Sequence, residues 1–316
     1  GGFSAAGCRI SGAVEHDEVA AKTLERNFVR LQPDAPPVIL RGSGGDLTEI
    51  ENVLTSEIGP PDILVGGPPC QGFSCVGRSR INGLRKGGFR ADPRNKLYKH
   101  FLELAMHWKP RAIVMENVPG MMSVGDQNVA EEVANDMAEL GYRVGYAILN
   151  AAWYGVPQYR ERLFFMGLRN DLKLLPEMPV TTHAALPAPG YRKPVSASNR
   201  TFDFVKDSEI HVLQGENPLL VTSVQDALKD LPLLKDHLQY AELTGQLLLK
   251  DLAVVDHKPR IVGSLPEPPP YKEDPRTDYA RFMRHWPGLP ESESVMDHEI
   301  RITRRDFETF RQMEPG

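Results

Sequence analysis

The stretch Ile63-Leu64-Val65-Gly66-Gly67-Pro68-Pro69-Cys70-Gln71-Gly72-Phe73-Ser74 decides the fold of this chain. Its three leading apolar residues predict a short buried strand, and the paired glycines and prolines predict a rigid turn at the carboxyl end of that strand. A thiol held in such a turn is well placed to act as a nucleophile once its pKa falls below the free value of about 8.5. A lone cysteine more often fills a gap in a core, but in this setting Cys70 is a candidate nucleophile.

Strands and helices alternate on both sides of this stretch. Apolar runs predict strands over residues 63–65, 112–115, 142–149 and 163–166, and residues spaced along one helical face predict helices over 17–28, 95–107 and 128–140. Because such alternation implies crossover connections, the predicted fold class is α/β, with a mostly parallel sheet covered on both faces. Sheets of this kind place their sites at the C-terminal ends of the strands.

The second half of the chain differs in character. Beyond about residue 170, prolines cluster and the periodicity of apolar residues weakens. We place a domain boundary near residues 172–181, between a catalytic domain over 1–175 and a smaller, loop-rich domain over 176–316. No internal repeat or low-complexity tract is evident.

Composition limits the class of protein. The 316 residues are 41% hydrophobic and 25% charged, which suits a soluble globular protein with a sizeable core. No apolar run approaches the roughly 20 residues that span a bilayer, and the first residues lack the pattern of a signal peptide. Three cysteines make no disulfide framework, so we expect a cytoplasmic protein without membrane association. Because the net charge is −5, nucleic-acid binding would need a local basic patch.

The segment between Phe73 and Asn95 is predicted to provide that patch. Asp92 is its only acidic residue, and its glycines predict a mobile loop. The basic residues are Arg78, Arg80, Arg85, Lys86, Arg90 and Arg94. A flexible basic loop suits contact with phosphate groups and closure over a ligand. Without the neighbouring Cys70, a solvated run of charges would be the better interpretation.

Two further elements carry candidate site residues. Glu116 follows a predicted strand and would lie beside Cys70 if the two strands are neighbours. A carboxyl group in a partly dry pocket can have a raised pKa and donate a proton, although a solitary glutamate is more often a cap or a surface carboxylate. In Gln158-Tyr159-Arg160-Glu161-Arg162, alternation places Arg160 and Arg162 on one side of an extended segment. Two guanidinium groups there suit phosphate, carbonyl or carboxylate recognition, the alternative being a surface charge pair with Glu161.

Together these elements resemble the hallmarks of the cytosine-C5 DNA methyltransferases. The family has a Pro-Cys-Gln loop, a Glu-Asn-Val strand end and a Gln-x-Arg-x-Arg segment, and all three occur here in the same order. The resemblance is close over residues 1–168 and weaker to the end, through 224–232 and 298–316. It implies a Rossmann-like S-adenosylmethionine-dependent methyltransferase sheet with a smaller target-recognition domain.

The resemblance also implies a mechanism. Cys70 would add to C6 of a cytosine in duplex DNA, which makes C5 nucleophilic toward the methyl group of S-adenosylmethionine. Glu116 would hold N3 and the exocyclic amine of the base, and Arg162, with Arg160 behind it, would act at O2 and a nearby phosphate. The base must be flipped out, because its target carbon is inaccessible in a stacked duplex.

Further contacts follow from the resemblance. The positions that match cofactor contacts are Gly2, Glu15, His16, Asp46, Pro69 and Leu97. The positions that match DNA contacts in the loop are Gln71, Ser74, Arg78 and Arg94. We expect no metal site, a monomer, double-stranded DNA as the partner, and a cognate restriction endonuclease as a functional partner. Base recognition is expected within about residues 180–300, with Tyr271, Tyr279, Arg281, Arg284 and His285 as candidates.

The sequence also departs from the family. Its first four residues resemble the tail of the family's Phe-x-Gly-x-Gly-Gly cofactor loop, so we expect a fragment truncated at both ends that lacks a central sheet strand. A tRNA cytosine-C5 methyltransferase is an alternative, but the Cys-Phe-Thr motif of that subgroup is missing, because the only cysteines are Cys8, Cys70 and Cys75. A catalytically inactive DNA-binding fragment and a Cys70–Cys75 redox pair are the remaining alternatives.

Overall fold

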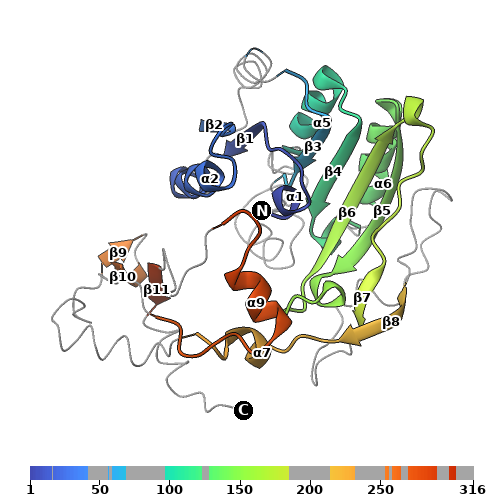
Figure 1. Cartoon of the computed structure of the whole chain (residues 1–316). Coiled ribbons are helices and arrows are strands. Elements are labelled where there is room, and N and C mark those ends of the chain that lie inside the picture. The colour runs from blue at the N-terminus through green and yellow to red at the C-terminus, as the bar shows by residue number, and fades with distance from the viewer. Residues whose placement is uncertain are drawn as a thin grey trace. The chain divides into compact units, whose positions relative to one another are not determined.

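The computed structural model of the chain describes residues 1–15, 17–41, 56, 59–68, 97–122, 128–184, 214–231, 253–255, 258–264, 270–289 and 299–303. Contacts divide the chain into two compact units, Gly1–Thr222 and Ser223–Gly316, and Figure 1 shows the elements of both. The domain boundary expected near residue 175 stays a prediction. In the part of the chain that the structure describes, no helix is long and apolar enough to cross a membrane.

The first unit contains a four-stranded sheet (Figure 1). Its strands are β3 (Ile63–Gly66), β4 (Ala112–Asn117), β5 (Tyr142–Asn150) and β6 (Glu161–Arg169), in the spatial order β3-β4-β6-β5. β3 and β4 are parallel, with Gly66 opposite Met115, whereas β6 runs antiparallel to both β4 and β5.

The strand directions correct one expectation. The α/β class is confirmed, but the mostly parallel arrangement is wrong for this sheet, in which only the β3–β4 pairing is parallel. The cause is the short connection over residues 151–160, because a parallel pair needs a crossover of about a dozen residues or more. β5 and β6 therefore pair as antiparallel neighbours.

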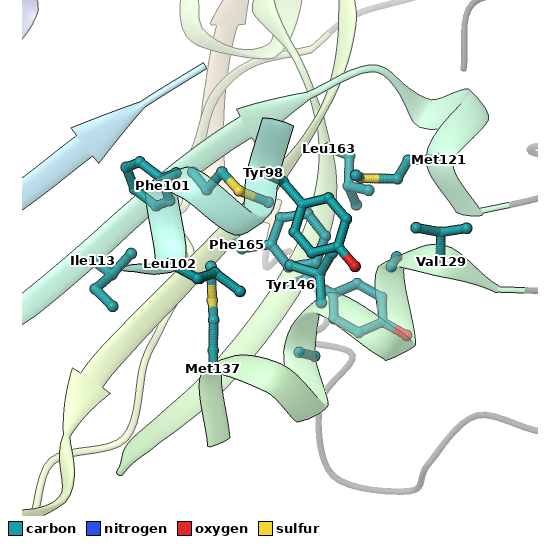
Figure 2. Packing of buried hydrophobic residues seen from close by; sticks show 14 of the residues in the cluster. Tyr98, Phe101, Leu102, Ile113, Met121, Val129, Met137, Tyr146, Leu163 and Phe165 are labelled. Atoms are coloured by element: carbon teal, nitrogen blue, oxygen red, sulfur yellow. The ribbon is translucent and has the colours of Figure 1, made fainter. Parts of the chain in front are cut away.

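Two helices, α5 (Leu97–Trp108) and α6 (Val129–Glu139), pack against one face of this sheet. Alternation along β4 directs Ile113 and Met115 to that face, where both are fully buried. Figure 2 shows how side chains from the helices and strands meet in this core, among them Tyr98, Phe101, Leu102, Met137, Tyr146, Leu163 and Phe165. Each large apolar side chain buried here contributes roughly 1.5–3 kcal/mol. The core therefore holds the strand ends in fixed register.

Gly66, the last residue of β3, allows the close approach of α5. A Cβ at this position would lie 2.5 Å from the Phe101 ring, which is nearer than any real Cβ contact. Only glycine fits without displacing the ring. The first glycine of the Gly66-Gly67 pair is thus explained by packing of the helix on the strand.

A two-stranded parallel sheet, β1 (Gly12–Glu15) and β2 (Val38–Arg41), belongs to the same unit. The connection between them contains α2 (Glu18–Leu31), which begins at Asp17, whose side chain accepts a hydrogen bond of 2.8 Å from the Ala20 amide. Two apolar residues of β2, Val38 and Leu40, pack against Trp108 of α5. A short helix, α1 (Gly2–Ala5), precedes β1.

The described part of the first unit also contains several short elements. They are η3 (Pro119–Met122), η4 (Ala151–Tyr154), η5 (Asn170–Leu172), β7 (Thr181–Ala184) and β8 (Gln214–Leu220). β7 and β8 form a parallel pair. Thr182 of β7 also approaches η4, because its hydroxyl lies 3.4 Å from the Trp153 carbonyl oxygen.

In its described residues, the second unit contains a three-stranded antiparallel sheet and two short helices. Its elements are α7 (Val224–Leu228), β9 (Ala253–Val255), β10 (Lys258–Ser264), α9 (Asp278–Arg284) and β11 (Glu299–Thr303). Arg284 of α9 contacts two residues that precede this helix in the sequence. Its Nη2 lies 2.6 Å from the buried Asp230 carboxylate, and its guanidinium lies 3.6 Å from the centre of the Tyr271 ring. Arg284 was a candidate for base recognition, but the structure engages its guanidinium within its own unit.

Candidate active site

Strand direction brings three segments to one edge of the four-stranded sheet. β3 and β4 are parallel, so their carboxyl ends, Gly66 and Asn117, lie at the same edge. β6 is antiparallel, so its first residues reach this edge, with Leu163 opposite Asn117. β3 and β4 are neighbours, so the condition on which Glu116 was expected to lie beside Cys70 is met. The first residues of β6, which include Arg162, lie at this edge only because β6 runs antiparallel to β4.

Glu116 and Arg162 meet on the face of the sheet opposite α5 and α6. Glu116 pairs with Phe164 across the strands, so Arg162 is its diagonal neighbour on that face. The Arg162 Nε lies 2.7 Å from the Glu116 Oε1, and the two side chains are 23% and 39% exposed. Arg162 also donates a 2.7 Å hydrogen bond to the Glu161 carbonyl oxygen. This pair combines hydrogen-bond acceptors and donors in a position that a ligand can reach.

The turn after β3 is held against the end of β4. A Cβ on Gly67 would lie 3.3 Å from the Glu116 Oε2, so the second glycine of the pair lies directly beside the carboxylate. Asn117 is 2% exposed. Its amide donates a 3.4 Å hydrogen bond to the Pro68 carbonyl oxygen, and its Oδ1 accepts a 2.9 Å bond from the Val118 amide. The segment that leads to Cys70 is therefore tied to the strand end that carries Glu116.

Asn150 is a residue of this edge that sequence reasoning missed. It ends β5, is 3% exposed, and its Oδ1 accepts hydrogen bonds from the backbone amides of Ala152 at 3.1 Å and Arg160 at 3.2 Å. The signal was present in the sequence, because an asparagine after a predicted strand and before a short turn is a typical cap. The Arg160 side chain is exposed, while its backbone is held by Asn150.

The described cofactor candidates lie apart from this pair in the sequence. Glu15 ends β1, and its Oε1 accepts a 2.9 Å hydrogen bond from the Asp17 amide. Gly2 lies exposed in α1, with nothing within 4 Å of the place where a Cβ would be. Leu97 begins α5, but its side chain is outside the described part. No described contact joins Gly2 or Glu15 to Glu116 or Arg162.

The other expected site residues lie outside the described residues. They are His16, Asp46, Pro69, Cys70, Gln71, Ser74, Arg78 and Arg94. Their roles stay predictions from the sequence. The described site therefore consists of the Glu116–Arg162 pair, the turn at Gly67 and Pro68, and the asparagines that support these two features.

Comparisons with known proteins agree with the sequence motifs. The family model described as C-5 cytosine-specific DNA methylase matches residues 1–253. The type II methyltransferase M.AquIA of Picosynechococcus is 36% identical, over 58% of this chain and 71% of its own length. M.OihORF3336P of Oceanobacillus iheyensis is 28% identical over 100% of this chain. A solved DNA modification methyltransferase encoded within an E. coli prophage is 30% identical over 57% of this chain and 49% of its own, with a TM-score of 0.43.

This chain spans only part of the length of the curated relatives that it matches. This chain spans 64% of the length of the Oceanobacillus iheyensis relative. It spans 38% of the length of M.DdeI, a type II methyltransferase of Desulfomicrobium norvegicum. The activity, substrate and partners of a whole methyltransferase are therefore matters of proposal for this chain.

Proposed function

The chain belongs to the C-5 cytosine-specific DNA methylase family, and from this premise we propose that it methylates C5 of a cytosine in double-stranded DNA through a covalent bond to Cys70. The single observation that supports this most is the Glu116–Arg162 pair, 2.7 Å apart at the edge of the sheet where β3 ends. Cys70 follows Pro68 by two positions, and two peptide units span at most about 7 Å. A chain of this length allows the proposed nucleophile to approach a base held by the pair.

The proposed reaction begins with the thiolate of Cys70. It forms a bond to C6 of the flipped cytosine, and the electron pair of the C5–C6 double bond becomes available at C5, where it forms the bond to the methyl group. Glu116 holds N3 and the exocyclic amine, and Arg162 donates hydrogen bonds to O2, so that the charge which develops on the ring is stabilised. Once C5 carries the methyl group, it loses its proton, and the electron pair of that C–H bond restores the C5–C6 double bond. The C6–S bond breaks at the same time, and its electron pair returns to the Cys70 sulfur as thiolate.

S-adenosylmethionine is the proposed cofactor, and it supplies the methyl group when it is bound. Two described residues suit it. Glu15 ends a parallel strand, where carboxylates commonly accept hydrogen bonds from ribose hydroxyls, and the space beside Gly2 is open. His16, Asp46, Pro69 and Leu97 are proposed to complete this site from their match to the family. Gln71, Ser74, Arg78 and Arg94 are proposed to contact DNA.

Covalent trapping tests the proposal. The protein is incubated with S-adenosylmethionine and duplex DNA that contains 5-fluorocytosine, from which the final elimination cannot occur because fluorine replaces the C5 proton. We expect an adduct that resists denaturation, and we expect none from Cys70→Ala. Transfer RNA that contains 5-fluorocytosine is the parallel substrate, since the tRNA enzymes share the motifs. Absence of an adduct with DNA, or an adduct with tRNA alone, would overturn the proposal.

Other proposals go with this function. The names of the relatives as type II methyltransferases support a role in restriction and modification, with a cognate endonuclease as the functional counterpart. The protein is proposed to act as a cytoplasmic monomer on DNA. The bounds 1–175 for the catalytic domain and 176–316 for target recognition remain part of the same proposal.

A further inference from the structure

The connection between β5 and β6 is held at its base by one side chain. Asn150 and Glu161 are the last residues that pair across these two strands. The ten residues between them, 151–160, form the connection and end at Arg160. The Asn150 Oδ1 accepts from the amides of Ala152 and Arg160. The Ala151 amide in turn donates a 3.0 Å hydrogen bond to the Arg160 carbonyl oxygen. The backbone of Arg160 is thus fixed through both its amide and its carbonyl group.

The middle of the connection, at Tyr154 and Gly155, is held by residues that follow β6 in the sequence. Gly155 has φ of 85°, a left-handed conformation that favours glycine. A Cβ there would lie 2.6 Å from the imidazole Cε1 of His183, so β7 lies directly on this turn. The hydroxyl of Tyr154 donates a 2.8 Å hydrogen bond to the Pro179 carbonyl oxygen. The connection is therefore held both at Asn150 and at its contacts with residues 179–183.

We propose that Asn150 is a positioning residue of the proposed active site, because its side-chain oxygen fixes the backbone at Arg160 and so sets where Arg162 meets Glu116. The inference rests on the proposed function. Arg162 is only two residues beyond the amide that Asn150 holds, and its pair with Glu116 depends on a 2.7 Å contact. A displacement of about 1 Å in catalytic geometry can cost about 100-fold in rate.

Asparagine makes two hydrogen bonds here that can be separated by substitution. Asn150→Ala removes the acceptor for both amides. In Asn150→Ser, the hydroxyl still caps the local turn at Ala152, as serine does at the starts of helices and turns. It is one bond shorter than the asparagine amide, so it does not reach the Arg160 amide as well. A residue that only stabilises the turn would be largely replaced by serine, whereas a positioning residue would not.

A matched control lies at the other end of the same strand. The buried Tyr142 hydroxyl donates a 2.8 Å hydrogen bond to the Pro110 carbonyl oxygen. Tyr142→Phe removes one buried hydrogen bond and touches neither Arg160 nor Glu116. It is expected to lower the thermal unfolding temperature of the protein, because the buried Pro110 carbonyl oxygen loses its hydrogen-bond donor.

The experiment measures, for the wild-type protein and the three variants, the rate of adduct formation on saturating 5-fluorocytosine DNA, the KM for DNA and the hydrogen exchange of the Arg160 amide. We expect Asn150→Ala and Asn150→Ser both to slow adduct formation by about 10- to 100-fold, with KM nearly unchanged. Both should lose exchange protection at Arg160, and only Asn150→Ala at Ala152. Tyr142→Phe should form the adduct at the wild-type rate.

The outcomes separate the two proposals. A wild-type protein that forms no adduct overturns the proposed function, and this inference with it. A wild-type protein that forms the adduct, together with an Asn150→Ser variant of near wild-type rate, overturns the positioning role alone. The same follows if Tyr142→Phe slows the reaction as much as Asn150→Ala, because the losses would then reflect stability rather than position.

Discussion

At the scale of single residues, the Glu116–Arg162 pair is expected to contribute little to the stability of the fold. Both side chains are partly exposed, at 39% and 23%, and exposed ion pairs typically add only about 0–1 kcal/mol. The geometry nevertheless holds a carboxylate and a guanidinium side by side at the end of β4. Such an arrangement is expected where a ligand, rather than the fold, is the partner of both groups.

Glu116→Gln is therefore expected to separate activity from stability. The amide keeps the shape of the side chain but loses the negative charge and the ability to take up a proton, so turnover should fall by about 100- to 10,000-fold. The free energy of unfolding should change by less than about 1 kcal/mol. Steady-state methylation of DNA and urea denaturation measure the two quantities.

A similar pair at the other end of β6 provides the control. Arg169 and Asp171 lie 2.7 Å apart, with 35% and 59% of their side chains exposed. Asp171→Asn breaks an ion pair of the same kind far from the site and should leave turnover unchanged. Equal losses of activity from both substitutions would show that Glu116 has no special role.

At the scale of helices and strands, a group of acids lies where α5 and α6 meet. The hydroxyl of Tyr98 on α5 donates to the carboxylates of Glu132 at 3.2 Å and Asp136 at 3.5 Å on α6. Burial is the main cause that raises the pKa of Asp136, the negative charges of Glu132 and Glu139 add to it, and the Lys99 charge and the Tyr98 bond oppose it. Burial raises the pKa of Tyr98 as well, so its hydroxyl stays protonated.

The stability of this helix pair should therefore depend on pH in a defined direction. Because the folded pKa of Asp136 is above its ordinary 3.8, the folded protein binds the proton more tightly than the unfolded chain. The stabilisation from protonation is complete below 3.8 and is lost as pH rises through the folded pKa. Asp136→Asn should thus raise the thermal unfolding temperature at pH 7, and the gain should shrink as the pH falls toward 4.

Asp171→Asn is the matched comparison, because the pKa of Asp171 is lowered in the folded protein whereas that of Asp136 is raised. Hydrogen bonding from Arg169 is the main cause that lowers the pKa of Asp171. Its contribution to stability is therefore present above the unfolded pKa and lost as pH falls. A gain from Asp136→Asn that stayed constant over this pH range would contradict the explanation by burial.

Local patterns in the sequence predicted most elements of the catalytic unit, but not their directions. The spacing of apolar residues predicted helices over 95–107 and 128–140, and α5 and α6 lie close to these bounds. The direction of β6 depends on the ten residues between two strands, and apolar patterns do not report direction. The local cap that Asn150 makes at Ala152 has a signal in the sequence, but its hydrogen bond to the Arg160 amide, ten positions away, has none. Cys70 and the basic loop after it stay predictions.

At the scale of the whole molecule, the two compact units are expected to unfold separately. The second unit contains a buried ion pair, since the side chains of Arg284 and Asp230 are only 12% and 6% exposed. The Asp230 Oδ1 is buried without a hydrogen-bond partner, so its carboxylate relies on Arg284. The sequence suggested recognition for Arg284 because it cannot show which arginines are already paired within the fold.

Arg284→Met should destabilise the second unit alone. Removing one partner of a buried pair leaves an uncompensated charge and costs about 3–5 kcal/mol, and the stacking on Tyr271 is lost as well. In calorimetry, the transition of residues 223–316 should move to lower temperature while that of residues 1–222 stays. Arg284→Lys keeps the positive charge but loses the planar guanidinium, so its transition temperature for residues 223–316 should lie between those of the wild type and Arg284→Met.

Arg281 on the same helix is the control for this prediction. It pairs with Asp278, but the two side chains are 51% and 98% exposed. Arg281→Lys should leave both transitions in place. A shift of both transitions by Arg284→Met would instead mean that the units unfold as one.

The reversed direction of β6 has a practical consequence. This strand starts at the catalytic edge and ends at Arg169, next to the beginning of β4. The turn that follows, with Lys173 in a left-handed conformation and mostly exposed neighbours, therefore lies away from the edge that carries Glu116. Exposed turns of this kind accept inserted sequence well. A fluorescent label or an affinity tag inserted after Lys173 should therefore leave the edge that carries Glu116 accessible to a substrate.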